Sequence, residues 1–189
     1  MRGTAPPAPK AFDAEKYLTT LDPEHESLKA IGLTAQTLRE WKAGYKKGKL
    51  MAAIEGSAGF MAISLEDQTT TFPKDVDPRL YIFGGYRLQM GDVQLLRSPL
   101  DVLMASEHGI TNCIAFLTEK ISVEQLFYLS KFLEDRKLES IILMSGCGPA
   151  TRRAFIPGPH KKLLPSHTIR LIPGTVPQLR ENVQTEKLI

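Results

Sequence analysis

A glycine-rich segment around residue 147 carries the residues best suited to bind an anion. In the stretch SGCGPATRR, Gly146 and Gly148 flank Cys147, and Arg152 and Arg153 follow. Backbone N–H groups of a glycine-rich turn that opens onto a helix can bind a phosphate, and nearby arginines would strengthen the site. The segment is not a Walker A loop, because no Gly-Lys-Ser/Thr follows. A tight turn without a ligand is the alternative interpretation.

The same turn holds a cysteine that could act as a nucleophile. A helix N-terminus lowers the pKa of a thiol, which would favour the thiolate of Cys147. Such a nucleophile also needs a base, and no histidine lies close to Cys147 in the sequence. Cys113 lies in an apolar stretch and is expected in the core. Two cysteines make no disulfide framework, as is usual for cytoplasmic proteins.

A second group of candidate binding residues is basic and lies in the first half of the chain. Lys46, Lys47 and Lys49 follow Tyr45 directly. Basic residues interleaved with aromatic ones are typical of a groove for single-stranded DNA or RNA. A solvated charged face is the alternative. Arg79, Arg87 and Tyr81 lie nearby in the same half, and a separate basic cluster is formed by His160, Lys161 and Lys162.

The net charge and composition limit the class of protein without naming its function. The chain has 189 residues, of which 42% are hydrophobic and 24% charged, as in a globular protein. A net charge of +3 permits a nucleic-acid partner and does not require one. No apolar stretch is long enough to span a bilayer, and residues 1–11 do not resemble a secretory signal. We therefore expect a cytoplasmic protein with no membrane partner.

Short helices and a hairpin are expected in the first half. Asp22 before Pro23 and Thr34 are predicted N-caps, and Gly32 and Gly44 are predicted helix ends. The expected helices cover residues 12–21, 22–32 and 34–44. Alternating apolar residues on both sides of a glycine-rich stretch predict two strands joined in a hairpin over residues 49–65.

From residue 91 the pattern alternates between strand and helix. Ser98 followed by Pro99 predicts the start of one helix, and Ser122 with Gln125 forms a capping box for the next. The expected strands cover residues 93–97, 112–116, 140–144 and 167–172. This alternation predicts a parallel α/β sheet with right-handed connections. Ligands bind such sheets beyond the carboxyl ends of the strands, where Arg97 would lie.

The stretch LLRSPLDVLMASEHGITNCIAFL resembles the first half of a Toprim domain of the bacterial primase type. In that family the first strand ends in Glu-Gly, and an Asp and an apolar helix follow after two more residues. The matching positions are Asp101, Gly109, Ile110, Asn112 and Ala115. GLTAQTLREWKAGYKKGKLMAAI and RLYIFGGYR resemble segments that precede the Toprim domain in these primases. The resemblance covers about residues 12–176 and implies a Toprim-like parallel sheet flanked by helices, after a small mixed α+β region.

The chain departs from the family at the positions that bind metal. Arg97 and Ser98 replace the Glu-Gly pair, and Ser145 and Cys147 stand where the family has Asp-x-Asp. A positive charge at Arg97 would repel a divalent cation. The resemblance therefore implies a Toprim domain with no metal, no cofactor and no catalytic residue. Asp101 is expected to interact with the N-terminal dipole of its own helix.

These observations predict a non-catalytic, primase-like protein that binds nucleic acid or acts in a replication or mobile-element assembly. Its expected partners are single-stranded DNA or RNA and proteins of such an assembly. Two alternatives stay open, namely a protein-interaction scaffold without a nucleic-acid role and an enzyme with a rearranged site at Cys147. The residues expected to bind nucleic acid or an anion are Lys46, Lys47, Lys49, Arg97, Arg152 and Arg153. The expected divisions are a flexible arm at 1–11, the primase-like α+β region at 12–90, the degenerate Toprim-like domain at 91–176 and a tail at 177–189.

Overall fold

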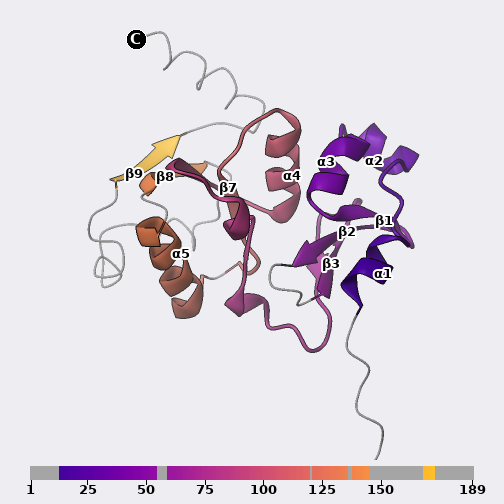
Figure 1. The fold of residues 1–189 in the computed structure, drawn as a ribbon, viewed down its shortest axis with the longest axis horizontal. Helices are drawn as coiled ribbons and strands as arrows, with labels where there is room; N and C mark the ends of the chain where they lie inside the picture. The colour runs from indigo at the N-terminus through magenta and orange to yellow at the C-terminus, as the bar shows by residue number, and fades with distance from the viewer. Residues whose placement is uncertain (1–12, 55–58, 120, 136–137, 145–167, 173–189) are drawn as a thin grey trace, which may run out of the picture.

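The computed structural model places two β-sheets at opposite ends of the molecule with one helix between them (Figure 1). It describes residues 13–54, 59–119, 121–135, 138–144 and 168–172. Several features predicted from the sequence lie outside these residues. They are the arm at 1–11, the glycine-rich turn with Ser145 and Cys147, the basic residues Arg152, Arg153, Lys161 and Lys162, and the tail at 177–189.

Three short helices precede the first sheet. They are α1 (Ala14–Leu18), α2 (Glu26–Ala30) and α3 (Ala35–Glu40). Thr34 caps α3 as predicted, since its side chain accepts a hydrogen bond from the N–H of Thr37. The prediction that Asp22 caps α2 is wrong, because α2 begins after His25. Asp22 instead forms a backbone bridge to Tyr45, with N···O distances of 3.0 and 2.8 Å.

The first sheet is antiparallel and has four strands in the order β1-β2-β3-β4. They are β1 (Ala43–Lys46), β2 (Lys49–Ile54), β3 (Gly59–Ser64) and β4 (Thr70–Thr71). The hairpin predicted over residues 49–65 is confirmed as β2 and β3. Gly44 is not a helix end but lies in β1, where a Cβ atom would come within 2.9 Å of the Cβ atom of Leu21. This close packing explains the glycine.

The second sheet has the order β5-β7-β6-β8-β9. Its strands are β5 (Ile82–Phe83), β6 (Gly91–Leu96), β7 (Cys113–Phe116), β8 (Leu138–Met144) and β9 (Thr168–Ile172). The four predicted strands are present and parallel. The short strand β5 pairs antiparallel with β7, so the whole sheet is mixed. The division of the chain at residue 90 stays a prediction.

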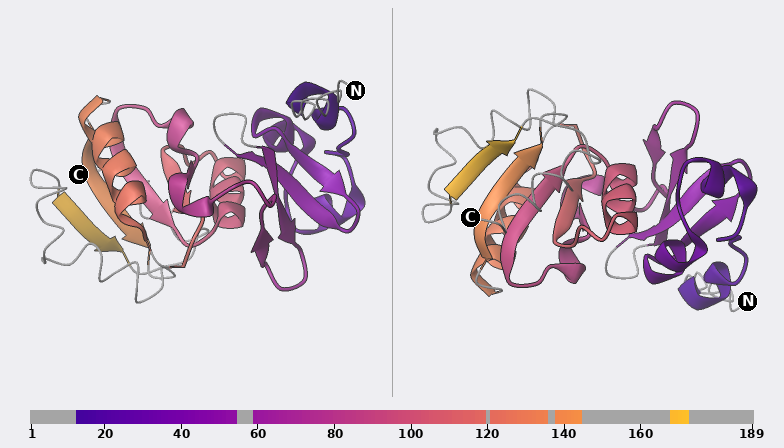
Figure 2. Two further views of the ribbon diagram at one scale, coloured as in Figure 1. Left: turned by 90° about the horizontal axis from the view of Figure 1, so that it is seen from below. Right: turned by 90° about the horizontal axis from the view of Figure 1, so that it is seen from above.

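Two helices flank this sheet, and α4 (Pro99–Glu107) lies between the two sheets in all views (Figures 1 and 2). Ser98 caps α4, and Pro99 occupies its first turn, as predicted. The capping box of α5 (Val123–Asp135) is confirmed by hydrogen bonds of 3.0 and 3.1 Å between Ser122 and Gln125. Gln125 also donates to backbone carbonyls around the 3-10 helix η2 (Pro78–Leu80). The side chain of Gln125 therefore joins α5 to the segment before β5.

Among the described residues, buried apolar side chains form one cluster that runs through both sheets and the helices packed against them. Leu38 and Trp41 contribute from the first region, and Leu103 and Leu129 from the second. Leu129, which α5 contributes, is fully buried. Cys113 is buried, and burial raises the pKa of its thiol to about 12. In the described part of the chain, no helix combines the length and apolar character that a membrane span requires.

Candidate nucleic-acid interface

Two turns of the four-stranded sheet lie at the same edge of that sheet. The turn that joins β1 to β2 is tight, and Lys46 pairs with Lys49 across it. Lys49 in turn pairs with Ser64, the last residue of β3. The turn that follows β3, residues 65–69, is closed by a hydrogen bond of 2.9 Å from the N–H of Ser64 to the carbonyl of Thr69. The lysines and the 65–69 turn are therefore neighbours.

Arg97 brings the second sheet to this edge. It follows directly after β6, at the carboxyl end of the parallel strands. Its Nη2 atom donates to Oε1 of Gln68 in the 65–69 turn at 3.1 Å. Its Nε and Nη2 atoms also donate to the two carboxylate oxygens of Asp101, at 3.1 and 3.2 Å. The binding edge expected for a parallel sheet thus contacts the 65–69 turn, which neighbours the lysine-bearing turn.

The residues at this edge do not fit a divalent metal ion. The carboxylate of Asp101 accepts hydrogen bonds from Arg97 and, at 2.9 Å, from the hydroxyl of Ser98. Mg²⁺ binds through carboxylate oxygens that are open to it, and a guanidinium already holds both oxygens here. Within the described residues, no group of three or more His, Cys, Asp or Glu side chains is placed to hold a metal.

The three lysines of the predicted groove differ in their exposure and in their contacts. Lys47 and Lys49 are exposed, and neither side chain makes a hydrogen bond or an ion pair with another described side chain. Lys46 turns toward α1, where its Nζ atom donates to the hydroxyl of Thr20 and lies 3.9 Å from the ring centroid of Tyr17. We refer to Lys47, Lys49 and Arg97 as the basic edge.

Acidic side chains balance much of this charge. Glu66 and Asp67 lie exposed in the 65–69 turn. Hydrogen bonds from Ser64 and from the N–H and hydroxyl of Thr69 lower the pKa of Asp67 to about 2, so it is ionised at neutral pH. Arg97 is paired with Asp101, and both are partly exposed, so this pair adds little to stability. A polyanion at the basic edge would be held mainly by Lys47 and Lys49.

The aromatic and basic residues expected near the lysines make contacts elsewhere. The ring of Tyr45 stacks on His25 with centroids 3.5 Å apart, so one of its faces is covered. Arg79 pairs with Asp77 at 2.7 Å. Arg87 lies over the ring of Trp41, with 4.5 Å from its guanidinium carbon to the ring centroid. These side chains do not extend the basic edge.

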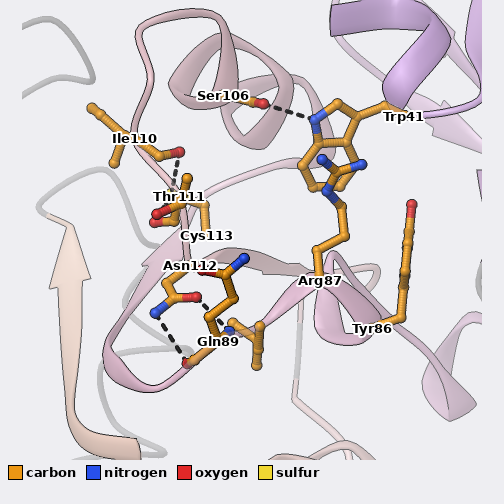
Figure 3. Close-up of a pocket in the computed structure, with 10 residues that line it drawn as sticks. Trp41, Tyr86, Arg87, Gln89, Ser106, Ile110, Thr111, Asn112 and Cys113 are labelled. Atoms are coloured by element: carbon orange, nitrogen blue, oxygen red, sulfur yellow. Dashed lines mark hydrogen bonds between the residues drawn. The ribbon is translucent and has the colours of Figure 1, made fainter.

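Arg87 and Trp41 instead line a pocket of about 390 Å³ that the sequence analysis did not anticipate (Figure 3). Its walls come from the end of α3, the 3-10 helix η3 (Gly85–Arg87), the residues before β6, the end of α4 and residues 110–113. These segments are far apart in the chain, so no local pattern marks the pocket.

Solved structures with the same fold are catalytic cores of bacterial-type primases. No family model matches the chain, and no curated protein sequence is significantly similar to it. The DnaG catalytic core matches with a TM-score of 0.64 and 13% identity, over 89% of this chain and 74% of that chain. A DnaG primase catalytic domain bound to single-stranded DNA matches with a TM-score of 0.67 and 12% identity, over 92% and 76%.

A third match is the RNA polymerase domain of Mycobacterium tuberculosis DnaG, in complex with a double-stranded DNA oligomer with a 6-nucleotide overhang. It has a TM-score of 0.60 and 17% identity, over 88% of this chain and 73% of that chain. The order of elements around the parallel strands agrees with the resemblance drawn from residues 12–176. The chain therefore has the primase-like Toprim fold, with Arg97 at the end of its first parallel strand.

Proposed function

We propose that this chain is a non-catalytic, primase-like protein that binds single-stranded nucleic acid at the basic edge. The observation that carries the proposal is the contact between Arg97 and Gln68. It brings a guanidinium, at the end of a parallel strand, beside the sheet edge that carries the two exposed lysines Lys47 and Lys49. Lysine and arginine side chains at one edge can neutralise successive phosphates of a strand.

The likeness to primase cores supports nucleic acid as the partner. Some of the matching structures contain DNA, among them one with single-stranded DNA and one with a double-stranded oligomer that carries an overhang. A role in a replication or mobile-element assembly is the setting that we propose for this binding. Arg152 and Arg153 remain proposed contributors to the same interface.

Salt-dependent binding tests the basic edge. Fluorescence anisotropy with labelled single-stranded DNA and RNA should show affinity that falls with salt, by about 0.7 in the log–log slope for each phosphate neutralised. Lys47→Gln with Lys49→Gln should reduce that slope by about 1.4, because two phosphate contacts are lost. Lys74→Gln with Lys131→Gln removes the same charge from exposed positions elsewhere and should leave the slope nearly unchanged. Equal losses in both double variants would contradict a specific edge.

The absence of metal-dependent catalysis is tested separately. We expect no tight Mg²⁺ or Mn²⁺ site in calorimetric titrations, because Arg97 holds the carboxylate of Asp101. A site of micromolar affinity that disappears in Asp101→Ala would contradict this proposal. Primer synthesis by the purified chain would contradict it too.

A protein-interaction scaffold is the second candidate, and one observation favours it. Large apolar side chains are exposed on η2 and α5, namely those of Leu80, Val123, Phe127 and Tyr128. Exposed apolar groups of this kind often mark a contact with another protein. On this alternative, neither DNA nor RNA binds at low salt. The third candidate, an enzyme that uses Cys147, predicts pH-dependent labelling of that thiol by an electrophile well below its ordinary pKa.

A further inference from the structure

We infer that the pocket beside Trp41 binds a nucleobase, at a site separate from the basic edge. The pocket lies at the start of β6 and β7, whereas Arg97 follows the end of β6. Five residue steps along β6 separate the two ends, which corresponds to about 17 Å. The inference concerns base recognition and does not depend on whether the basic edge binds a strand.

One wall of the pocket is a stacked and anchored arginine. The guanidinium of Arg87 lies over the indole of Trp41 at 4.5 Å. Its Nη1 atom donates to the carbonyl of Glu40 at 2.8 Å, and the Glu40 carboxylate lies 3.7 Å from Nη2. The indole is held in turn by its Nε1 atom, which donates to the hydroxyl of Ser106 at 2.9 Å, and by stacking on Phe83. The wall is therefore planar and preorganised.

The floor of the pocket is also rigid. Asn112 has a positive φ of 57°, and its side-chain Oδ1 atom accepts from the N–H of Gln89 at 2.6 Å. Its Nδ2 atom donates to the carbonyls of Gln89 and Met90, at 3.1 and 3.2 Å. In Figure 3 this amide lies below and to the left of Arg87 and Trp41. A volume of about 390 Å³ suits a small molecule or one base rather than a length of chain.

One aromatic side chain on the wall of the pocket remains exposed to solvent. Tyr86 lines the pocket and is 39% exposed. The ring of Tyr86 meets that of Trp41 edge to face, with centroids 6.4 Å apart. An aromatic ring that remains exposed beside a planar cation offers a stacking surface for a flat ligand.

The charge balance favours a base over a free anion. Glu40 pairs with Arg87, so the pocket offers no unpaired positive charge to a phosphate. The planar guanidinium of Arg87 and the exposed ring of Tyr86 provide stacking faces, and polar side chains such as Thr111 can bind the edge of a heterocycle. The base can come from a free nucleotide or from a nucleic-acid strand, and its chemistry is the same in both cases.

The single tryptophan of the chain makes this inference directly measurable. Adenosine, AMP and a short oligodeoxyadenylate would each be titrated while Trp41 fluorescence is recorded, with free N-acetyltryptophanamide as the correction for light absorbed by the base. We expect saturable quenching by adenosine and AMP. Tyr86→Ala should raise the apparent Kd at least about fivefold, whereas Tyr86→Phe, which keeps the ring, should preserve it.

The matched control is Tyr128→Ala, which removes a ring of similar exposure, 42%, from α5 and should leave the Kd unchanged. Tyr86→Leu gives a second test if Tyr86→Ala fails to fold by circular dichroism, and it should weaken binding similarly. Quenching by the oligonucleotide as well would identify strand bases as ligands, and quenching by adenosine and AMP alone would identify free nucleotides. No quenching by any probe, or quenching unaffected by loss of the Tyr86 ring, would overturn the inference.

The same titrations separate this site from the proposed function. An oligonucleotide that binds by anisotropy without any change in Trp41 fluorescence, together with no response to adenosine, would overturn the pocket and leave the basic edge intact. Quenching by AMP in a protein that binds no strand at low salt would support the pocket and contradict the basic edge.

Discussion

Replacement of Gly84 should destabilise the protein more than replacement of any other positive-φ glycine whose surroundings the structure describes. Gly84 has φ of 85°, a conformation that costs an L-residue about 1–2 kcal/mol. A Cβ atom there would lie 2.5 Å from the carbonyl oxygen of Cys113 and 3.3 Å from the Trp41 ring. The obstacle is the backbone of β7 in the second sheet, so it cannot move aside without disturbing the strand pairing. Overpacking of this kind adds about 1–3 kcal/mol.

Gly84→Ala should therefore lower the free energy of unfolding by about 2–5 kcal/mol. Gly109→Ala is the matched control, because Gly109 also has positive φ, 73°, but a Cβ atom there meets nothing within 4 Å. Gly109→Ala should lower the free energy of unfolding only by the cost of the positive-φ backbone, about 1–2 kcal/mol. Urea denaturation of both variants, followed by circular dichroism, measures the difference. A difference below about 0.5 kcal/mol would refute the argument that contact with β7 requires glycine at residue 84.

Three further changes test packing and electrostatics by the same denaturation measurement. Leu129→Ala should cost about 2–5 kcal/mol, because the side chain is fully buried, and a loss below about 0.5 kcal/mol would place α5 away from the core. Gln94→Met should stabilise the protein by about 1 kcal/mol, because the buried Oε1 atom of Gln94 has no hydrogen-bond partner among the described residues; destabilisation would show that the amide is satisfied. Although burial disfavours its ionisation, hydrogen bonds from Thr34 and Thr37 lower the pKa of Glu107. The Glu107 carboxylate therefore adds to the free energy of unfolding above its unfolded-state pKa, and this contribution is lost as the pH falls through its folded-state pKa. Glu107→Gln should flatten the dependence of the free energy of unfolding on pH in that window. An unchanged pH dependence would contradict this expectation.

Local signals in the sequence were sufficient for several helix boundaries. Thr34, Ser98 and Ser122 were correctly predicted as N-caps, because a cap interacts with a backbone N–H only two or three residues away. The capping box of Ser122 and Gln125 is of the same kind. The β2–β3 hairpin could also be predicted from the sequence, since alternating apolar residues indicate a strand with one buried face.

Predictions failed where a distant segment outweighed the local preference. Asp22 has the chemistry of an N-cap, but its backbone pairs with Tyr45 and leaves the cap of α2 to His25. Gly44 was expected to end a helix, yet it lies in β1 and pairs with Met51, where a Cβ atom would come within 2.9 Å of Leu21. The resemblance to primases located Arg97 at a strand end, but it did not indicate the contact with Gln68.

The sequence by itself determined the alternation of strands and helices after residue 91 and the caps of α3, α4 and α5. Each depends on residue type or on neighbours a few positions apart. Only the tertiary structure decided which cations share an edge and that Trp41, Tyr86 and Arg87 border one pocket. The physical reason is that these contacts join segments separated by tens of residues, and their closeness depends on how the whole core packs.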